Sequence, residues 1–293
     1  MEYINDLYEK ATIPDPRTQE WLLMPSIWPT VIIVSMYLIV IIGGQRVMRN
    51  REPFQLNNAM MIYNFCLVVL NAYIFYEFLM TTWLSWEFSK VCNPVDQGSE
   101  LADRLARNCW FFFFSKSIEL MDTVFFMLRK KNTQITFLHL YHHSTMPLIW
   151  YIGVKYAPGG ESYFSASINS GIHVLMYTYY LLAAMGPSMQ KFLWWKRYMT
   201  VMQLMQFWGI LFHTSYAIYT DCGYPNMYNW ALIFYDFSHI ALFSNFYYQT
   251  YTKKARAARA KREESNGRHD KQEEVSNGVH AKNGNTRLRS RRD

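Results

Sequence analysis

Three histidines lie close together in the middle of the chain, His139, His142 and His143. Residues 137–154 around them are apolar and long enough for a helix that crosses a lipid bilayer. On a helix, positions i, i+3 and i+4 share one face, so the three imidazoles are expected to point the same way. Ionisable groups are costly at that depth and usually mark chemistry or a transport path. The cluster therefore predicts a functional site.

The spacing of these histidines allows two kinds of site. Three imidazoles can ligate zinc or iron, or one imidazole can be a nucleophile that accepts an acyl group while its neighbours set its tautomer and pKa. A diiron centre needs many more histidines, whereas this chain has 8, and two of them (His269 and His280) lie near its carboxyl end. That count disfavours an oxygen-activating desaturase, and a three-ligand zinc site remains open on count alone.

Polar side chains occur in the other apolar segments as well. Lys116, Glu119 and Asp122 fall within about 120° of arc on a helix of residues 109–128. They form either a functional site or a self-neutralising cluster that tolerates burial. A single hydrogen bond between membrane helices is worth about 0.6 kcal/mol, but polar faces on five consecutive segments predict a shared cavity. Its other residues would be Thr123; Asn169, His173, Met176, Tyr177 and Tyr180; Thr200, Gln203, Gln206 and His213; and Asp236, His239 and Asn245.

The apolar segments themselves predict an all-α membrane protein. The chain is 51% hydrophobic, and it lacks the apolar-polar alternation of a transmembrane barrel, which leaves helices as the spanning elements. Seven segments are long enough to span, at residues 27–44, 58–80, 109–128, 137–156, 163–185, 198–219 and 228–251. We therefore expect an acidic amino-terminal segment (1–26), a seven-helix domain (27–252) and a polar, disordered tail (253–293).

Basic residues predict the orientation of these helices. They gather in the links after the first, third and fifth segments and in the tail, whereas the other links have few. By the positive-inside rule the amino terminus is then lumenal and the carboxyl terminus cytosolic. The formal net charge of +7 is explained by these links and the tail, so it indicates topology and attraction to lipid or phosphate and does not indicate nucleic-acid binding.

Two of the four cysteines, Cys92 and Cys222, fall in links on the non-cytosolic side, where disulfides persist. A bridge between them and a pair of unrelated free thiols are both open interpretations.

Five short motifs resemble those of the very-long-chain fatty-acid elongases, a family of membrane 3-ketoacyl-CoA synthases. They occur in the order of the family, and the resemblance extends from Arg51-Glu52-Pro53-Phe54 to the last apolar segment. Gln134 and Tyr141 are similar to the branch of the family that uses polyunsaturated substrates. The five motifs are Lys116-x-x-Glu119-x-x-Asp122-Thr123, His139-x-x-His142-His143, Asn169-x-x-x-His173-x-x-Met176-Tyr177-x-Tyr179-Tyr180, Thr200-x-x-Gln203-x-x-Gln206-Phe207 and Leu242-Phe243-x-x-Phe246-Tyr247-x-x-x-Tyr251.

The resemblance implies a multi-pass protein of the endoplasmic reticulum membrane, with six helices in a barrel-like ring around an acyl tunnel and the seventh outside it. It implies that an acyl-CoA and malonyl-CoA condense to a 3-ketoacyl-CoA two carbons longer, with release of CO2 and CoA and without a metal or a bound cofactor. His142 would carry the acyl group as an acyl-imidazole, with His173 as its partner across the tunnel. His139 and His143 would orient it, and the polar tunnel lining would be Lys116, Glu119, Asp122, Asn169, Tyr177, Gln203 and Gln206.

The resemblance also implies partners. CoA phosphates would contact cations at the cytosolic mouth, and the expected set is Lys116, Arg129, Lys130, Lys131, Lys196 and Arg197. A ketoacyl-CoA reductase, a dehydratase and an enoyl reductase would complete the elongation cycle, and oligomers with itself or with related elongases are expected. Two other functions compete with this one, a metal-dependent lipid desaturase or hydroxylase and a non-enzymatic seven-helix transporter or receptor.

Overall fold

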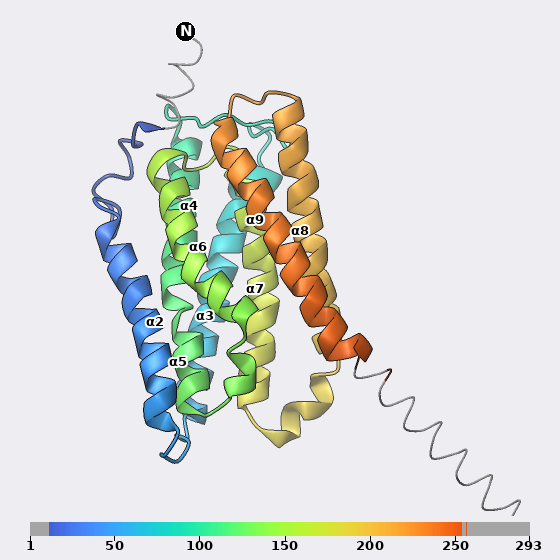
Figure 1. Cartoon of the computed structure of the whole chain (residues 1–293). Coiled ribbons are helices and arrows are strands. Elements are labelled where there is room, and N and C mark those ends of the chain that lie inside the picture. Colours follow the sequence, from blue (N-terminus) through green and yellow to red (C-terminus); the bar gives the residue numbers. More distant parts are fainter. Residues whose placement is uncertain (1–11, 254–255, 257–293) are drawn as a thin grey trace, which may run out of the picture. The chain divides into compact units, whose positions relative to one another are not determined.

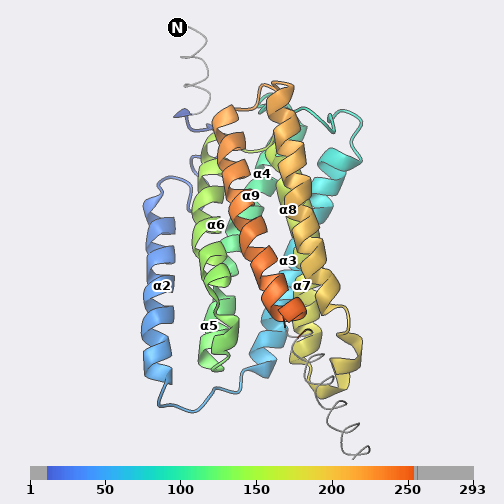
Figure 2. The same cartoon turned by 45° about the vertical axis from the view of Figure 1, so that its right-hand side comes forward.

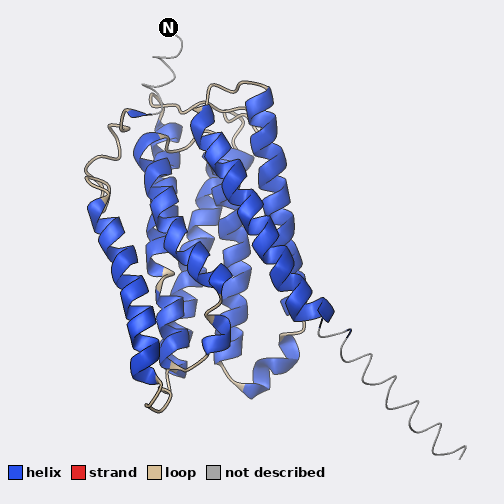
Figure 3. Ribbon diagram, viewed as in Figure 1, coloured by secondary structure: helices blue, strands red, loops and turns tan. Residues whose placement is uncertain are grey.

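The computed structural model describes residues 12–253 and residue 256, and within them all regular secondary structure is helical (Figure 3). The predicted all-α class is thereby confirmed. The chain divides into two compact units, Met1–Phe243 and Ser244–Asp293. Residues 1–11 of the predicted amino-terminal segment (1–26) and nearly all of the predicted tail (253–293) lie outside the described residues.

Eight α-helices are described, together with short 3₁₀ or π-helical turns at Leu79–Trp83, Asn132–Gln134, Pro187–Phe192 and Tyr248–Lys253. The helices are α2 (Trp28–Met48), α3 (Asn57–Phe78), α4 (Glu100–Ile118), α5 (Met121–Leu128), α6 (Phe137–Tyr156), α7 (Ser162–Ala184), α8 (Lys196–Tyr219) and α9 (Asn226–Tyr247). Each of the seven apolar segments predicted from the sequence thus contains helix.

Two of the described helical stretches are long and apolar enough to cross a membrane by themselves, Trp28–Met48 and Asn57–Trp83. Only 22% of each apolar window is buried inside the protein. Large apolar side chains such as Ile39 and Ile62 are therefore exposed along these helices, as they are on helices that face lipid.

The helices of the first unit run back and forth between two ends (Figure 1). The links after α2, α5 and α7 lie at one end, and the links after α3, α6 and α8 lie at the other (Figures 1 and 2). Helix α3 packs along α7, and one cause is Gly171, where a Cβ atom would come within 3.1 Å of the Phe75 ring. Helix α4 contacts α3 and α6, whereas α2 lies at the edge of the unit beside α5 and α6 (Figure 2).

The segment predicted as a single helix over 109–128 is instead two helices, which corrects that prediction. Helix α4 begins earlier, where the hydroxyl of Ser99 caps it by accepting from the amide of Ala102. It ends at Ile118, and the amide of Asp122 bonds to the carbonyl of Glu119 in a tight turn before α5. The hydroxyl of Ser115 donates to the carbonyl of Phe112 (2.7 Å), a side-chain bond that competes with helical bonding just before the break.

Candidate active site

The break between α4 and α5 positions three polar side chains of the first motif. Lys116 lies in the last turn of α4, Glu119 lies in the break itself, and Asp122 lies in the first turn of α5. All three are buried, at 2%, 1% and 6% exposure. Because the helix is interrupted, the three side chains do not follow one continuous helical stripe. Lys116 and Glu119 contact each other and His173, whereas Asp122 contacts Tyr177.

Lys116, Glu119 and His173 form a closed triangle of contacts between α4 and α7. The Lys116 ammonium donates to the Glu119 carboxylate at 2.9 and 3.1 Å, and it lies 3.1 Å from Nδ1 of His173. The same Nδ1 atom is 3.1 Å from Glu119 Oε1. This ring nitrogen either accepts from Lys116 or donates to Glu119, so these two residues decide where His173 carries its proton.

The buried position of Lys116 bears on its predicted contact with CoA. Its ammonium is already paired inside the protein and is 2% exposed. A phosphate-binding group at an open mouth would instead be exposed, because it must exchange water for a phosphate. The lysine is therefore placed to hold Glu119 and His173.

Asp122 and Thr123 connect α5 to other helices. The hydroxyl of Tyr177 on α7 donates to Asp122 Oδ2 at 2.8 Å. The hydroxyl of Thr123 lies 2.9 Å from that of Tyr37 on α2 and 2.8 Å from Nε2 of His139 on α6. Tyr37 belongs to the first apolar segment and was not among the predicted site residues, because nothing in the sequence relates it to the histidines.

The three histidines of the cluster lie in the first two turns of α6. The helix begins where the hydroxyl of Thr136 accepts from the amide of His139 (3.2 Å). The rings of His139 and His143 are close neighbours, with centroids 4.2 Å apart, and those of His142 and His143 are 5.5 Å apart. His143 is thus a ring neighbour of both other histidines, whereas His139 bonds to Thr123 of α5 and His142 to His239 of α9.

The hydrogen-bond partner of His142 is His239 of α9, not His173. Nδ1 of His142 lies 3.2 Å from Nε2 of His239, whereas His173 contacts Lys116 and Glu119. His239 is thus a neighbour of His142 that the sequence did not indicate, and the role of His173 as a partner of His142 across the tunnel stays a prediction. The sequence indicates His239 only as one of several polar residues in the last apolar segment. The one signal for a functional role is that an ionisable group is costly at that depth.

The remaining predicted lining residues are less closely joined. Asn169 on α7 and Gln206 on α8 are buried, and the Asn169 amide donates to the Gln206 carbonyl oxygen at 3.5 Å. The side-chain oxygen of Asn169 has no hydrogen-bond partner among the described residues. Gln203 contacts the sulfur of Met176 at 3.8 Å. Within the described residues, no three His, Cys, Asp or Glu side chains are grouped as metal ligands are.

The predicted CoA cations other than Lys116 lie in the link after α5 and in the first turn of α8, at the same end of the first unit (Figure 1). Arg129 and Lys130 are half-buried after α5 and bond to Asn57 and to the carbonyl of Arg49. Three further cations are exposed: Lys131, Lys196 and Arg197.

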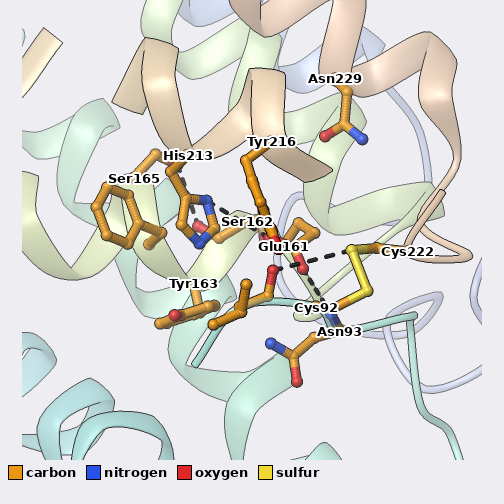
Figure 4. Close-up of polar contacts among 12 residues, drawn as sticks. Cys92, Asn93, Glu161, Ser162, Tyr163, Ser165, His213, Tyr216, Cys222 and Asn229 are labelled. Carbon is orange, nitrogen blue, oxygen red and sulfur yellow. Dashed lines mark hydrogen bonds and ion pairs between the residues drawn. A yellow bond between two sulfur atoms is a disulfide. The ribbon is translucent and has the colours of Figure 1, made fainter. Parts of the chain in front are cut away.

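A second polar cluster lies at the other end, in the links after α3, α6 and α8 and on α8 itself (Figure 4). A disulfide joins Cys92 to Cys222, the pairing considered from the sequence, with Cα atoms 5.0 Å apart. Beside it the Glu161 carboxylate accepts from the amide of Asn93 and lies 3.5 Å from Nδ1 of His213 (Figure 4). Burial raises the pKa of Glu161 to about 7. This cluster was not predicted, because its members come from three separate segments.

The family model and the similar proteins named below indicate the same family. A family model described as "ELO: GNS1/SUR4 family" matches residues 22–259. The chain is 45% identical over 278 residues to very long chain fatty acid elongase 4 of Mus musculus, and the alignment covers 93% of this chain and 89% of that protein. It is 47% identical over 266 residues to very long chain fatty acid elongase 1 of Homo sapiens, covering 89% and 95%. It is 44% identical over 243 residues to very long chain fatty acid elongase 7 of Rattus norvegicus, covering 82% and 86%.

Proposed function

The chain belongs to the ELO: GNS1/SUR4 family, and on this basis we propose that it is a very-long-chain 3-ketoacyl-CoA synthase. It condenses a long-chain fatty acyl-CoA with malonyl-CoA and releases CO2, CoA and a 3-ketoacyl-CoA two carbons longer, the first step of fatty-acid elongation. The observation that carries this proposal is the similarity to named elongases over nine-tenths of the chain, 45% identical across 93% of its residues.

We propose that the protein spans the endoplasmic reticulum membrane seven times, with a lumenal amino terminus and a cytosolic carboxyl terminus. Six of the spans would surround an acyl tunnel, and α2 would be the seventh, because it lies at the edge of the first unit and contacts only α5 and α6 extensively. The basic links after α2, α5 and α7 share one end, and the disulfide lies in links at the other. This arrangement supports the predicted orientation.

The first half of the proposed reaction transfers the acyl group to His142. A neutral imidazole nitrogen attacks the thioester carbonyl, a C–N bond forms, the C–S bond breaks, and CoA leaves as a thiolate that takes a proton from solvent. Acyl-imidazole is an activated acyl donor, so one hard condensation is divided into two easier steps. Walls that exclude water would slow hydrolysis of this intermediate.

The second half uses malonyl-CoA as the nucleophile. Loss of CO2 leaves an enolate, which attacks the acyl carbon; the new C–C bond forms, the C–N bond to His142 breaks, and the imidazole is restored. The enolate oxygen needs hydrogen-bond donors. The amides of Asn169 and Gln203 are suitable in chemistry, and their partners at 3.5 and 3.8 Å are long contacts that a substrate oxygen can replace.

CoA is bound in this proposal by the cations of one end. Lys131, Lys196 and Arg197 are exposed there, and Arg129 and Lys130 directly precede Lys131 in the link after α5. Phosphate groups favour such cations because the hydrogen bonds are charge-assisted. The expected reductase, dehydratase and enoyl reductase would consume the product in turn. A polyunsaturated acyl substrate and an oligomer with itself or a related elongase remain expectations from the sequence motifs.

The direct test uses purified protein in lipid nanodiscs with one long-chain acyl-CoA and no malonyl-CoA. We expect intact-mass spectrometry to show one added acyl group and peptide mapping to place it on His142. Substitution His142→Ala should remove the adduct and lower 3-ketoacyl-CoA formation by on the order of 10³-fold or more, as loss of a nucleophile does.

The matched control is His213→Ala, which removes a half-buried histidine from the other end of the first unit, stacked on Phe164. It should keep both the adduct and the activity. Full activity of His142→Ala would refute the nucleophile, iron-dependent use of oxygen would favour a desaturase, and tight ligand binding without turnover would favour a transporter or receptor.

A further inference from the structure

His239 is a fully buried imidazole (0% exposed) that the reaction described above does not use. It lies on α9, and its Nε2 atom is 3.2 Å from Nδ1 of His142. Its other ring nitrogen, Nδ1, is 3.0 Å from the main-chain carbonyl oxygen of Tyr235, one turn earlier in the same helix. The two nitrogens of His239 therefore connect the proposed nucleophile to a backbone acceptor.

These contacts decide which nitrogens carry protons. A carbonyl oxygen only accepts hydrogen bonds, so Nδ1 of His239 must be the protonated nitrogen. In a neutral imidazole the other nitrogen is then a lone-pair acceptor, and this is Nε2 of His239. Nδ1 of His142 must donate to it, and Nε2 of His142 is left with its lone pair.

The neighbouring hydroxyl groups agree with this assignment. The Ser238 hydroxyl donates to the same Tyr235 carbonyl at 2.6 Å, so toward Nδ1 of His239 (3.4 Å) its oxygen can only accept. In the 3.0 Å hydrogen bond between Tyr141 and Ser238, the Tyr141 hydroxyl can be the donor. Both hydrogen-bond neighbours of Nδ1 of His239, the Tyr235 carbonyl and the Ser238 hydroxyl, are thus acceptors. Each of them therefore places the proton of His239 on Nδ1.

Helices α6 and α9 are joined by a seam of three polar pairs, without extensive backbone contact. The pairs are Tyr141–Ser238 (3.0 Å), His142–His239 (3.2 Å) and Thr145–Tyr235 (2.7 Å). The ring of Phe207 on α8 packs against His239, with centroids 5.3 Å apart. Because its Nδ1 atom bonds to the Tyr235 carbonyl and its ring packs against Phe207, His239 is held with Nε2 toward His142.

We propose that His239 is a positioning residue that holds His142 as the Nδ1–H tautomer, so that Nε2 of His142 is the acyl-accepting atom. This inference rests on the proposed function. Acylation at Nε2 would place a positive charge on the ring, and Nε2 of His239 accepts the Nδ1 proton as the C–S bond breaks. The proton returns to Nδ1 of His142 when the enolate takes the acyl group and the C–N bond breaks. No proton is gained or lost by the pair over one cycle.

Three variants in nanodiscs test the proposal. His239→Phe keeps a ring but offers no acceptor; His239→Gln can place its side-chain oxygen where Nε2 lies but cannot store a proton. Tyr235→Phe is the matched control, because it breaks the shorter hydrogen bond of the same seam and leaves the Tyr235 carbonyl in place. The readouts are the single-turnover rate of acyl adduct formation, the acyl-CoA concentration for half-maximal rate, and ¹⁵N spectra of histidine-labelled protein with His142→Ala as the assignment reference.

We expect His239→Phe to slow adduct formation by on the order of 100-fold, the usual size of a proton-transfer contribution, with an unchanged half-maximal concentration. His239→Gln should recover part of that loss, Tyr235→Phe should match the parent protein, and only His239→Phe should lose the ¹⁵N signature of a protonated Nδ1 on His142. Equal rates for the parent and His239→Phe, or a His142 protonated on Nε2 in the parent, would overturn the inference. A parent protein that forms no adduct would instead overturn the covalent reaction itself.

Discussion

At the scale of single residues, His142 and His173 are held by different kinds of neighbour. His142 meets a second imidazole, whereas His173 meets a lysine and a glutamate that are also paired with each other. Removing one member of a buried ion pair leaves an uncompensated charge, which is strongly destabilising. The triangle around His173 is therefore a rigid unit, and the contact between His142 and His239 is the simpler one to alter without loss of the fold.

Another residue-scale consequence concerns Glu161, which lies before α7 and faces the amide of Asn93 and the ring of His213. Its pKa is raised by burial from 4.5 to about 7. Between these two values the folded protein binds the proton that the unfolded chain has released, so the free energy of unfolding falls as the pH rises through this range. Above the folded pKa the loss is complete.

We predict that Glu161→Gln flattens the pH dependence of the melting temperature between pH 4.5 and 7, because the amide does not titrate. Thermal melts in detergent at half-unit pH steps would measure it. The control is Glu87→Gln, an exposed carboxyl in the link after α3, which should retain the slope of the parent protein. An unchanged slope in Glu161→Gln would show that another group titrates there.

At the scale of elements, the disulfide ties the link after α3 to the link between α8 and α9. The two cysteines are separated by 130 residues of sequence. A cross-link over such a distance restricts the unfolded chain, and native disulfides typically contribute about 2–4 kcal/mol. The bridge stabilises the end of the first unit that is opposite to the proposed CoA mouth.

The double substitution Cys92→Ser and Cys222→Ser should accordingly lower the melting temperature by several degrees, while the activity at low temperature stays near that of the parent. Differential scanning fluorimetry and product formation at 10 °C would measure the two quantities. Cys66→Ser removes an exposed free thiol from α3 and is the matched control. If the double variant melts with the parent, the bridge does not contribute to stability.

At the scale of the whole molecule, the first unit has two chemically different ends. One carries the exposed cations Lys131, Lys196 and Arg197, and the other carries the disulfide and a buried carboxyl. This polarity suits a protein that receives CoA esters from the cytosol while its opposite end lies in an oxidising compartment.

We predict that the pair of substitutions Lys131→Gln and Lys196→Gln raises the KM for malonyl-CoA by about tenfold and leaves kcat nearly unchanged, because each lost charge-assisted bond weakens binding of the phosphates. The effect should shrink at high salt, where surface charges are screened. Steady-state kinetics at two ionic strengths would measure it. Arg107→Gln, an exposed cation on α4 near the other end, should behave as the parent, and an equal rise in KM there would argue for a non-specific charge effect.

The sequence by itself determined the helical class, the approximate position of each apolar segment and the identity of the family. These follow from local properties: residue spacing along a helix, length against bilayer thickness, and motifs a few residues long. The placement of His139, His142 and His143 as ring neighbours in one helix is of this kind.

Only the tertiary structure decided which groups meet between helices. The break after Ile118, the pairing of His142 with His239 and the contacts of Lys116 and Glu119 with His173 were not predicted. Periodicity relates a residue only to neighbours on its own helix. The rotation and depth at which two helices pack depend on all the side chains between them, so contacts between α6 and α9 exist only once the whole unit has assembled.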